Sequence, residues 1–222
     1  MCGRFTITLE PADLQEELEL GEFPADFIAR YNVAPTQPVA VVRNITGRNV
    51  EWMRWGLIPS WAKDPAIGSR MINARSETLM EKPSFHEALV KRRCLLISDG
   101  FYEWHKQSGK TPSIPYFFHL QTSKPFFFAG LWDIWKSQEG EAITSCTIIT
   151  CPSNELVGAV HERMPVMLAG ETSWQWLNPG KPLELQQLLR PFPAAEMETY
   201  QVRPMVNSPA VDSFELLKKV ED

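Results

Sequence analysis

Alternation of apolar and polar residues predicts that much of this chain forms short β-strands. The runs at 39–43 and 50–55 flank the turn Asn44–Gly47 and are predicted to pair as a hairpin. Two aromatic runs, 115–120 and 125–132, are predicted to form a second hairpin. The predicted strands are 3–9, 39–43, 50–55, 94–98, 99–104, 115–120, 125–132, 144–150 and 200–206.

Between these strands, several segments have apolar residues at helical spacing. Pro11 suits the first turn of a helix, and Leu14 and Leu18 then fall on one face. Ser153–Asn154 predicts an N-terminal cap for a short helix that ends at Val160. Besides this capped helix, helices are predicted at 11–20, where Pro11 begins the helix, and at 82–93, 171–177 and 183–189, with a short, frayed helix at 214–220.

Many short strands with helices on the outside predict an α+β fold, built on a twisted, barrel-like and mainly antiparallel sheet. The chain shows no internal repeat, low-complexity run or linker, so residues 1–222 are expected to form a single domain. From about residue 208 the tail is expected to be peripheral.

Composition and charge narrow the range of partners. Hydrophobic residues make up 44% of the chain and charged residues 22%, which is typical of soluble globular proteins. No run has the length of a membrane span or the layout of a signal peptide, so a cytoplasmic protein is expected. The net charge of −5 argues against general coating of nucleic acid, yet the segment 30–93 carries eleven Lys/Arg and five Asp/Glu. Such a local basic face can hold a short stretch of phosphates.

The four cysteines fall into two kinds. Cys94 and Cys146 lie in apolar strands and are expected to be buried, reduced thiols, and nothing marks Cys151 as reactive. The spacing fits no zinc site, and no metal or cofactor is expected. Cys2 differs, because removal of Met1 would expose an α-amine beside the thiol.

Two reactions are open to such an N-terminal cysteine. With an aldehyde, the amine forms a Schiff base and the thiol can close a five-membered thiazolidine ring. Alternatively, the thiolate attacks an amide with the α-amine as its base. Gly3 has no Cβ and lets a second reactant approach the backbone closely.

Three further side chains are candidates for the same chemistry. Asn73 and Arg75 share one side of an extended segment and suit a carbonyl and a phosphate, respectively. Glu103 is set among large aromatic residues, so its pKa is expected to rise towards neutral pH. His161 lies at a helix end, where it can face a cleft. With Cys2 as the nucleophile, the amide of Asn73, the carboxyl group of Glu103 and the imidazole of His161 complete the set that carbonyl chemistry requires.

Six motifs follow one another in a fixed order. They are Cys2–Phe5, Arg30–Pro35, Trp55–Trp61, Ile72–Arg75, Gly100–Trp104 and His161–Pro165. With these motifs the chain resembles the SOS response-associated peptidase (SRAP) family from residue 2 to about residue 207. The resemblance implies a monomer near the replication fork or nucleoid that captures abasic sites in single-stranded DNA as a thiazolidine on its N-terminal cysteine. It also implies AP lyase and self-processing peptidase activities.

The resemblance also implies roles for individual residues. Cys2 matches the crosslinking residue, and Asn73 matches the residue that positions the Cys2 backbone and the opened sugar. Glu103 matches the proton carrier for Schiff-base formation and β-elimination, and His161 matches the second acid/base, used in ring closure and reversal. The family positions near the phosphates or along the DNA channel are Arg4, Asn32, Pro35, Trp61, Arg75, Trp104 and Arg163.

One departure from the family concerns stacking beside the lesion. Ala62 follows Trp61, where some relatives carry a second tryptophan, so stacking there is expected to be weaker.

Two other functions stay open at the level of sequence. An N-terminal-nucleophile amidohydrolase such as a glutamine amidotransferase also begins Met-Cys-Gly, but it would give the arginine and tryptophan loops no role. A non-catalytic single-strand binder would retain DNA equally well after Cys2→Ala.

Overall fold

The computed structural model of the protein describes residues 2–107, 113–178 and 182–221. Its strands are β1 (Phe5–Ile7), β2 (Arg30–Val33), β3 (Pro38–Arg43), β4 (Val50–Trp55), β5 (Asn73–Arg75), β6 (Arg93–Ser98), β7 (Gly100–His105), β8 (Ile114–Leu120), β9 (Phe126–Lys136), β10 (Ala142–Pro152), β11 (Arg163–Pro165), β12 (Met167–Leu168) and β13 (Met197–Gln201). The α-helices are α1 (Pro11–Leu18), α2 (Pro83–Lys91), α3 (Glu155–Gly158), α4 (Glu171–Leu177) and α5 (Pro182–Gln186). The 3₁₀ helices are η1 (Pro65–Arg70), η2 (Ser76–Thr78), η3 (Ala194–Glu196), η4 (Pro204–Asn207) and η5 (Phe214–Leu217).

The larger sheet closes into a barrel. Strands β4, β3, β6, β9 and β10 pair antiparallel in that order, and β10 closes the ring by pairing in parallel with β4 through Ser145 and Cys146. Beyond the barrel, β10 carries β5 on one edge and β11 on the other. The predicted pairing of 39–43 with 50–55 is confirmed as β3 and β4.

A second, antiparallel sheet packs beside the barrel in the order β13-β8-β7-β1-β2. Phe5 from β1 contacts Trp55 and Phe128 of the barrel edge to face, with ring centroids 5.1 and 5.6 Å apart. The first strand of the chain is therefore anchored in the main apolar core, and the residues just before it are held in a defined place. The observed fold is α+β on a barrel-like, mainly antiparallel sheet, as the sequence predicts.

Gly130 in β9 permits the barrel to close. A Cβ at this position would lie 2.5 Å from Cδ1 of Leu96 and 2.9 Å from the backbone oxygen of Thr147. Gly130 pairs with both flanking strands, through Cys94 and Ile148. The strands cannot separate without breaking these ladders, so only a residue without a side chain fits between them.

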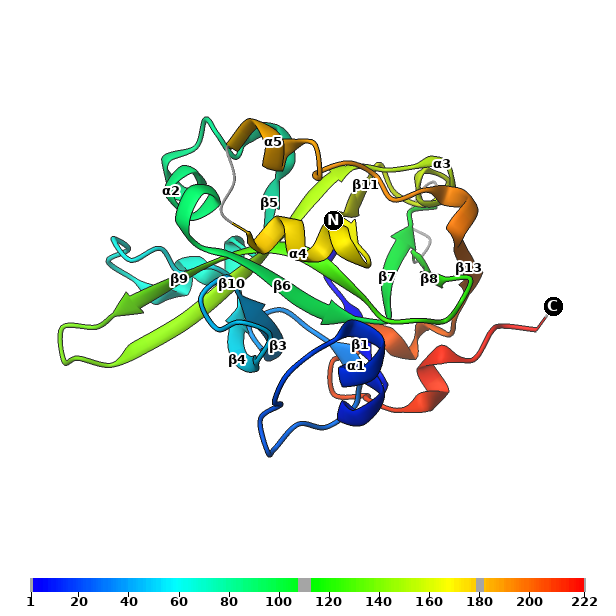
Figure 1. The fold of residues 1–222 in the computed structure, drawn as a ribbon. Coiled ribbons are helices and arrows are strands. Elements are labelled where there is room, and N and C mark those ends of the chain that lie inside the picture. Colours follow the sequence, from blue (N-terminus) through cyan, green and yellow to red (C-terminus); the bar gives the residue numbers. More distant parts are fainter. Residues whose placement is uncertain (1, 108–112, 179–181, 222) are drawn as a thin grey trace.

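The helices lie on the outside, where α2 and α4 pack against β6 and β9 (Figure 1). Asn154 caps α3 as predicted, since its Oδ1 accepts a hydrogen bond from the backbone N–H of Val157 at 2.9 Å. No helix within 2–107, 113–178 or 182–221 is long and apolar enough to cross a membrane.

The predicted aromatic hairpin of 115–120 with 125–132 is wrong. β8 pairs with β7 and β13, whereas β9 pairs with β6, β10 and β12. Phe126, Phe127 and Phe128 are all buried although they alternate between the two faces of β9. A strand that buries both faces needs covering on both. Phe127 packs on Trp174 of α4, whereas Phe128 packs on Phe5 of β1 and Phe101 of β7.

The tail expected to fray is anchored. Leu216 in η5 is fully buried in a cluster with Tyr102, Val202 and Val206. The backbone N–H of Val220 donates to the backbone oxygen of Gln201 at 3.0 Å. The last strand, β13, both begins and ends earlier than the predicted strand 200–206, and residues 204–207 form η4 instead.

Candidate active site at the N-terminal cysteine

Asn73 holds the backbone beside Cys2. Asn73 begins β5, which is fixed by parallel pairing with β10 opposite Ile148. Its side-chain Nδ2 donates to the backbone oxygen of Cys2 at 2.8 Å. Its Oδ1 is buried and accepts no hydrogen bond from any residue that the structure describes. Because buried amide oxygens are seldom left without a donor, this oxygen is available for a donor from another molecule.

Glu103 brings a buried carboxyl group to the same place. It lies in β7, whose neighbour β1 follows Cys2 directly, and only 3% of its surface is exposed. Burial raises the pKa of Glu103, while the positive charge of His161 acts in the opposite direction. The burial and the rise in pKa expected from the aromatic surroundings are confirmed. A carboxyl group with a raised pKa is suited to both donating and accepting a proton near neutral pH.

The thiol of Cys2 is fully buried. Burial raises the pKa of this thiol, and the negative charge of Glu103 raises it further. The neutral thiol is therefore the stable form at neutral pH. A base must take its proton when the sulfur attacks, because the thiolate is the nucleophile.

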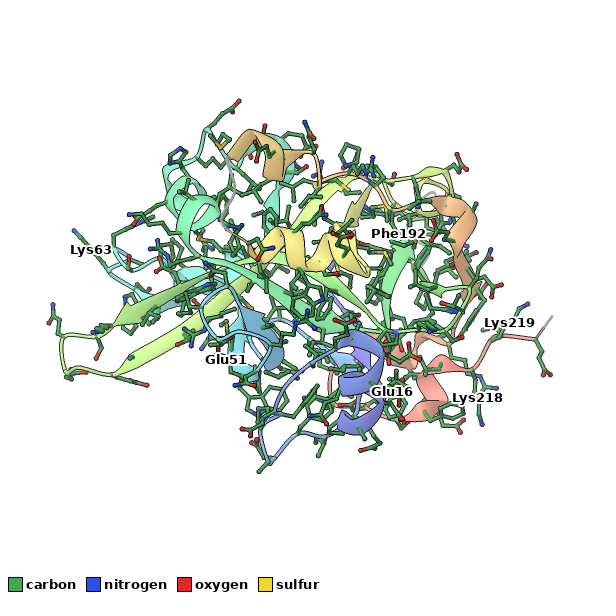
Figure 2. The ribbon with its side chains drawn as sticks, in the orientation of Figure 1. Glu16, Glu51, Lys63, Phe192, Lys218 and Lys219 are labelled. Atoms are coloured by element: carbon green, nitrogen blue, oxygen red, sulfur yellow. The ribbon has the colours of Figure 1, made fainter. Side chains whose placement is uncertain are left out.

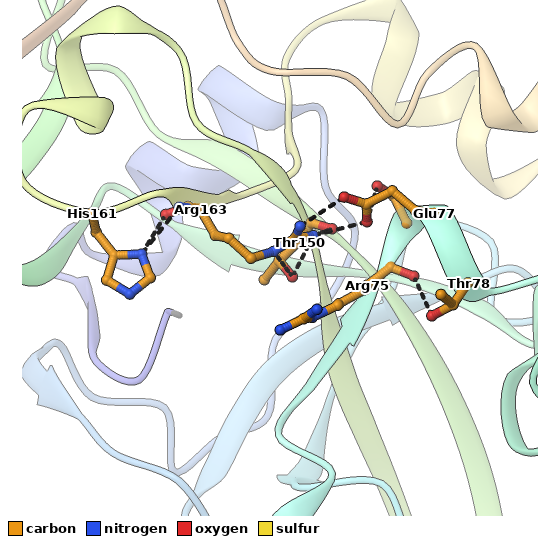
Figure 3. Close-up of polar contacts among 7 residues, drawn as sticks. Arg75, Glu77, Thr78, Thr150, His161 and Arg163 are labelled. Atoms are coloured by element: carbon orange, nitrogen blue, oxygen red, sulfur yellow. Dashed lines mark hydrogen bonds and ion pairs between the residues drawn. The ribbon is translucent and has the colours of Figure 1, made fainter.

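His161 follows α3, and its imidazole is held by the backbone of Arg163 (Figure 3). Nδ1 of His161 lies 3.0 Å from the backbone nitrogen of Arg163 and 3.2 Å from its backbone oxygen. The N–H can donate to the neutral ring, and the carbonyl can accept from the protonated ring. Both charge states of His161 are therefore supported at the same ring orientation. Since the charges of His161 and Cys2 both interact with Glu103, the three groups are electrostatic neighbours.

The arginines predicted to lie near phosphates differ in their exposure to solvent and in their ionic partners. Arg75 is exposed, and its guanidinium makes no hydrogen bond or ion pair with the residues the structure describes; Figure 3 shows it extending away from the pair formed by Arg163 and Glu77. The Arg163 guanidinium is buried, and its Nη1 and Nη2 donate to the two carboxylate oxygens of Glu77 at 2.7 and 2.9 Å. Of these two cations, Arg75 is the one presented to solvent.

Arg4 is also engaged within the protein. Its Nη1 donates to Oδ1 of Asn32 and to the backbone oxygen of Val206, both at 2.8 Å. Asn32 is buried and donates through Nδ2 to the backbone oxygens of Ser208 and Val211 at 3.0 and 2.7 Å. Arg4 and Asn32 thus attach the C-terminal segment to the second sheet.

Trp104 and Pro35, which are predicted to shape the channel, have different surroundings. Trp104 donates through Nε1 to Oδ1 of Asn207 at 2.7 Å, and the Arg4 guanidinium carbon lies 6.0 Å from the centre of its ring. Pro35 is half-buried beside the turn at Thr36, where φ is 71°.

Trp61 is the most open of the predicted channel residues. It is 62% exposed and lines a cavity of about 540 Å³. Lys63 and Arg70 line the same cavity, and Figure 2 shows Lys63 projecting from the edge of the molecule. An open indole beside two cations is suited to stacking on a base while the cations approach its phosphates.

Glu77 is a site residue that sequence reasoning missed. It lies two positions after Arg75 and binds Arg163 across the sheet. The sequence signal was an acidic residue two positions after the motif 72–75, inside the basic segment of the chain. Among the residues the structure describes, no group of three or more His, Cys, Asp or Glu side chains could hold a metal ion.

Comparison with known proteins places this site in a family. The family model described as SOS response associated peptidase (SRAP) matches residues 1–209, a range that contains every site residue named above. The chain belongs to the SRAP family.

Relatives in the SRAP family match almost the whole chain. The abasic site processing protein YoqW of Bacillus subtilis (strain 168) is 47% identical over 223 residues, which covers 98% of this chain and 99% of YoqW. The abasic site processing protein HMCES of Rattus norvegicus is 32% identical over 257 residues, covering 94% of this chain and 73% of HMCES. A crystal structure of a protein from Bacteroides thetaiotaomicron is similar with a TM-score of 0.87 at 26% identity, covering 99% of this chain and 100% of that one.

Proposed function

We propose that this protein binds abasic sites in single-stranded DNA and captures them covalently on Cys2 once Met1 has been removed. Relatives that span the chain are named abasic site processing proteins. The observation that carries the chemical proposal is the meeting of Cys2 with an amide, a carboxyl group and an imidazole, with Oδ1 of Asn73 still able to accept a hydrogen bond. An opened deoxyribose supplies both an aldehyde carbon for Cys2 and hydroxyl donors for Asn73.

The first chemical step is imine formation. The α-amine of Cys2 attacks the aldehyde carbon, a C–N bond forms, and the resulting hydroxyl group leaves as water when the C=N bond forms. Glu103 accepts a proton from the amine and donates one to the departing water. Its raised pKa suits it to both transfers.

Ring closure follows on the same carbon. The sulfur of Cys2 adds to the imine carbon, and the thiol proton moves through His161 to the nitrogen, so the complete reaction releases one water. The raised pKa of the thiol requires that its proton be taken as the C–S bond forms. His161 is suited to this transfer because the backbone of Arg163 supports both its charge states.

Reversal and strand release use the same groups. Opening of the ring returns the imine, with His161 giving a proton to the sulfur, and hydrolysis then frees the aldehyde. If Glu103 instead removes a proton from the sugar carbon next to the imine carbon, the 3′ phosphate leaves by β-elimination. Arg75 binds a phosphate beside the lesion, since its guanidinium has no ionic partner in the described parts of the chain.

The deciding experiment is a crosslinking assay. Purified protein is incubated with a single-stranded oligonucleotide that contains uracil and has been treated with uracil-DNA glycosylase, and the products are separated on a denaturing gel. We expect a protein–DNA species that survives denaturation, is absent with the untreated oligonucleotide, and disappears with Cys2→Ala.

The same assay separates the alternative functions. A non-catalytic binder would give no species that survives denaturation, and its DNA retention on a native gel would be unchanged by Cys2→Ala. An amidohydrolase would release ammonia from glutamine without DNA. Either result, with no denaturant-resistant species, would contradict the proposal.

A further inference from the structure

The pair formed by Glu77 and Arg163 crosses the sheet beside the site. Glu77 lies in η2, directly after β5, whereas Arg163 begins β11. Between them runs β10, in which Thr150 pairs with Arg75 of β5 on one edge and with Pro165 of β11 on the other. The Arg163 side chain therefore reaches over β10 to a residue that follows β5 (Figure 3).

The guanidinium is fixed at several points along this path. Nη1 and Nη2 of Arg163 donate to the two carboxylate oxygens of Glu77 at 2.7 and 2.9 Å. Nη2 also donates to the backbone oxygen of Thr150 at 2.7 Å. A bidentate pair of this kind sets orientation as well as distance.

The two ends of this connection belong to the two halves of the site. On the β5 side, Asn73 holds the backbone of Cys2. On the β11 side, the backbone nitrogen and oxygen of Arg163 lie 3.0 and 3.2 Å from Nδ1 of His161. A shift of the Arg163 backbone would therefore move these two contacts of Nδ1 relative to Cys2.

We propose that Glu77 is a positioning residue, which holds Arg163 so that the Arg163 backbone keeps the His161 imidazole aligned with Cys2 through its cycle of proton transfer. The inference rests on the proposed function, because it assigns His161 a proton-transfer role. Glu77 itself contacts no reacting atom in this scheme. A further consequence is that Arg163 serves the fold of the site, and that phosphate binding falls to Arg75.

Charge explains why a neutral residue would not replace Glu77. Only 8% of Arg163 is exposed, so its cation needs a counter-charge. The hydrogen bonds from Arg163 lower the pKa of Glu77 to about 2, which keeps Glu77 ionised at neutral pH. With Glu77→Gln the buried cation loses its counter-charge and is expected to turn towards solvent. The Arg163 backbone then keeps its pairing with Pro152 of β10 but loses its side-chain anchor, so that it can shift beside His161.

The test compares Glu77→Gln with Glu81→Gln in the full chain. Glu81 is exposed, lies four residues further on and makes no ion pair with any described residue, so it controls for the change in net charge. The first readout is the ¹⁵N NMR signal of the His161 ring without DNA. The second is the rate of thiazolidine formation and reversal with an abasic oligonucleotide, after circular dichroism has shown that each variant is folded.

For Glu77→Gln we expect an altered or broadened Nδ1 signal and rates of ring closure and reversal about tenfold lower. This effect is smaller than the ~10²–10⁴-fold contribution of a complete acid/base group, because His161 is still present. Glu81→Gln should match the wild type in both readouts. Glu77→Asp keeps the negative charge on a shorter side chain, so its rates should lie between those of Glu77→Gln and the wild type. If Glu77→Gln does not fold, Glu77→Asp is compared with the wild type in its place.

The outcomes are separable from those of the proposed function. A wild-type signal and wild-type rates in Glu77→Gln would overturn the positioning role. Lower rates with an unchanged His161 signal would overturn it too, since Glu77 would then affect the rates without positioning the imidazole. If the wild-type protein forms no crosslink at all, the proposed function fails, and the NMR comparison alone still decides whether Glu77 positions His161.

Discussion

Two regions of this molecule bury a cysteine, and they differ in what surrounds it. Cys2 and Cys146 are both fully buried, and burial raises the pKa of both thiols. Cys146 lies in the barrel, in β10, opposite Trp132 of β9 and Trp55 of β4. Cys2 instead lies beside the amide of Asn73 and the carboxyl group of Glu103.

The difference lies in the polar groups beside the thiol, because both thiols are fully buried. In the barrel, closure is so tight that Gly130 has no room for a Cβ. At Cys2, a buried amide oxygen is left without a donor from the described residues and a carboxyl group is buried at a cost in free energy. Buried polar groups of these two kinds are typical of functional sites.

The largest effect, on the yield of the crosslink, is expected when each of the two cysteines is replaced in turn by alanine. Cys2→Ala should abolish the denaturant-resistant DNA species, because the sulfur that closes the ring is lost. Cys146→Ala should keep the crosslink yield and lower the melting temperature, because it creates a cavity in the barrel. Gel yield and thermal melting check both, and equal crosslink yields would remove the distinction between the two regions.

The next largest effect is expected for Glu103→Gln. The amide keeps the shape but cannot transfer the proton, so imine formation should slow by ~10²-fold or more, as for the loss of a general acid/base. Single-turnover crosslinking measures the rate. An unchanged rate would assign the proton transfers to another group.

The same variant tests the pKa of Glu103 through stability. Its folded-state pKa is raised by burial, so its contribution to stability is present below the ordinary carboxyl pKa and is lost as pH rises through the raised value. Glu103→Gln has no proton to lose. As pH rises across this window, the unfolding free energy of Glu103→Gln should therefore increase relative to that of the wild type. Urea unfolding at several pH values measures this difference. A difference that stays constant with pH would contradict a raised pKa.

A stability effect of middle size is expected for Gly130→Ala. The added Cβ would meet Leu96 at 2.5 Å and the Thr147 backbone oxygen at 2.9 Å, and the ladder prevents relief. Overpacking of this kind costs ~1–3 kcal/mol. Urea unfolding measures the loss. Gly140→Ala is a control for glycine replacement away from the barrel interior, since a Cβ there would meet nothing within 4 Å, although its φ of 91° adds a backbone strain of its own. A smaller loss for Gly130→Ala than for Gly140→Ala would contradict tight closure.

The smallest effect is expected for Arg75→Gln. Loss of one phosphate contact should weaken binding to an oligonucleotide without a lesion and reduce the salt slope by about one. Fluorescence anisotropy over a series of salt concentrations measures both. Arg70→Gln is a comparison at the Trp61 cavity. An unchanged slope for Arg75→Gln would show that its exposed guanidinium does not bind phosphate.

Much of the fold and the candidate site could be predicted from local patterns. The strands 39–43 and 50–55, the cap at Asn154 and the burial of Glu103 all follow from residues near one another in sequence. The chemistry proposed for Cys2 was predicted from the residue type and its place next to Met1. Such features depend on the alternation of side chains and on the groups they carry, which the chain states directly.

What the tertiary structure decided is which distant segments meet. The sequence does not reveal that β10 pairs in parallel with β4 to close the barrel, or that β8 and β9 join different sheets. Nor does it reveal that Arg163 pairs with Glu77 across β10 while Arg75 faces solvent. These pairings depend on which strand faces are buried against each other and on which charged groups are buried as a pair. Both are set only when the sheets pack together.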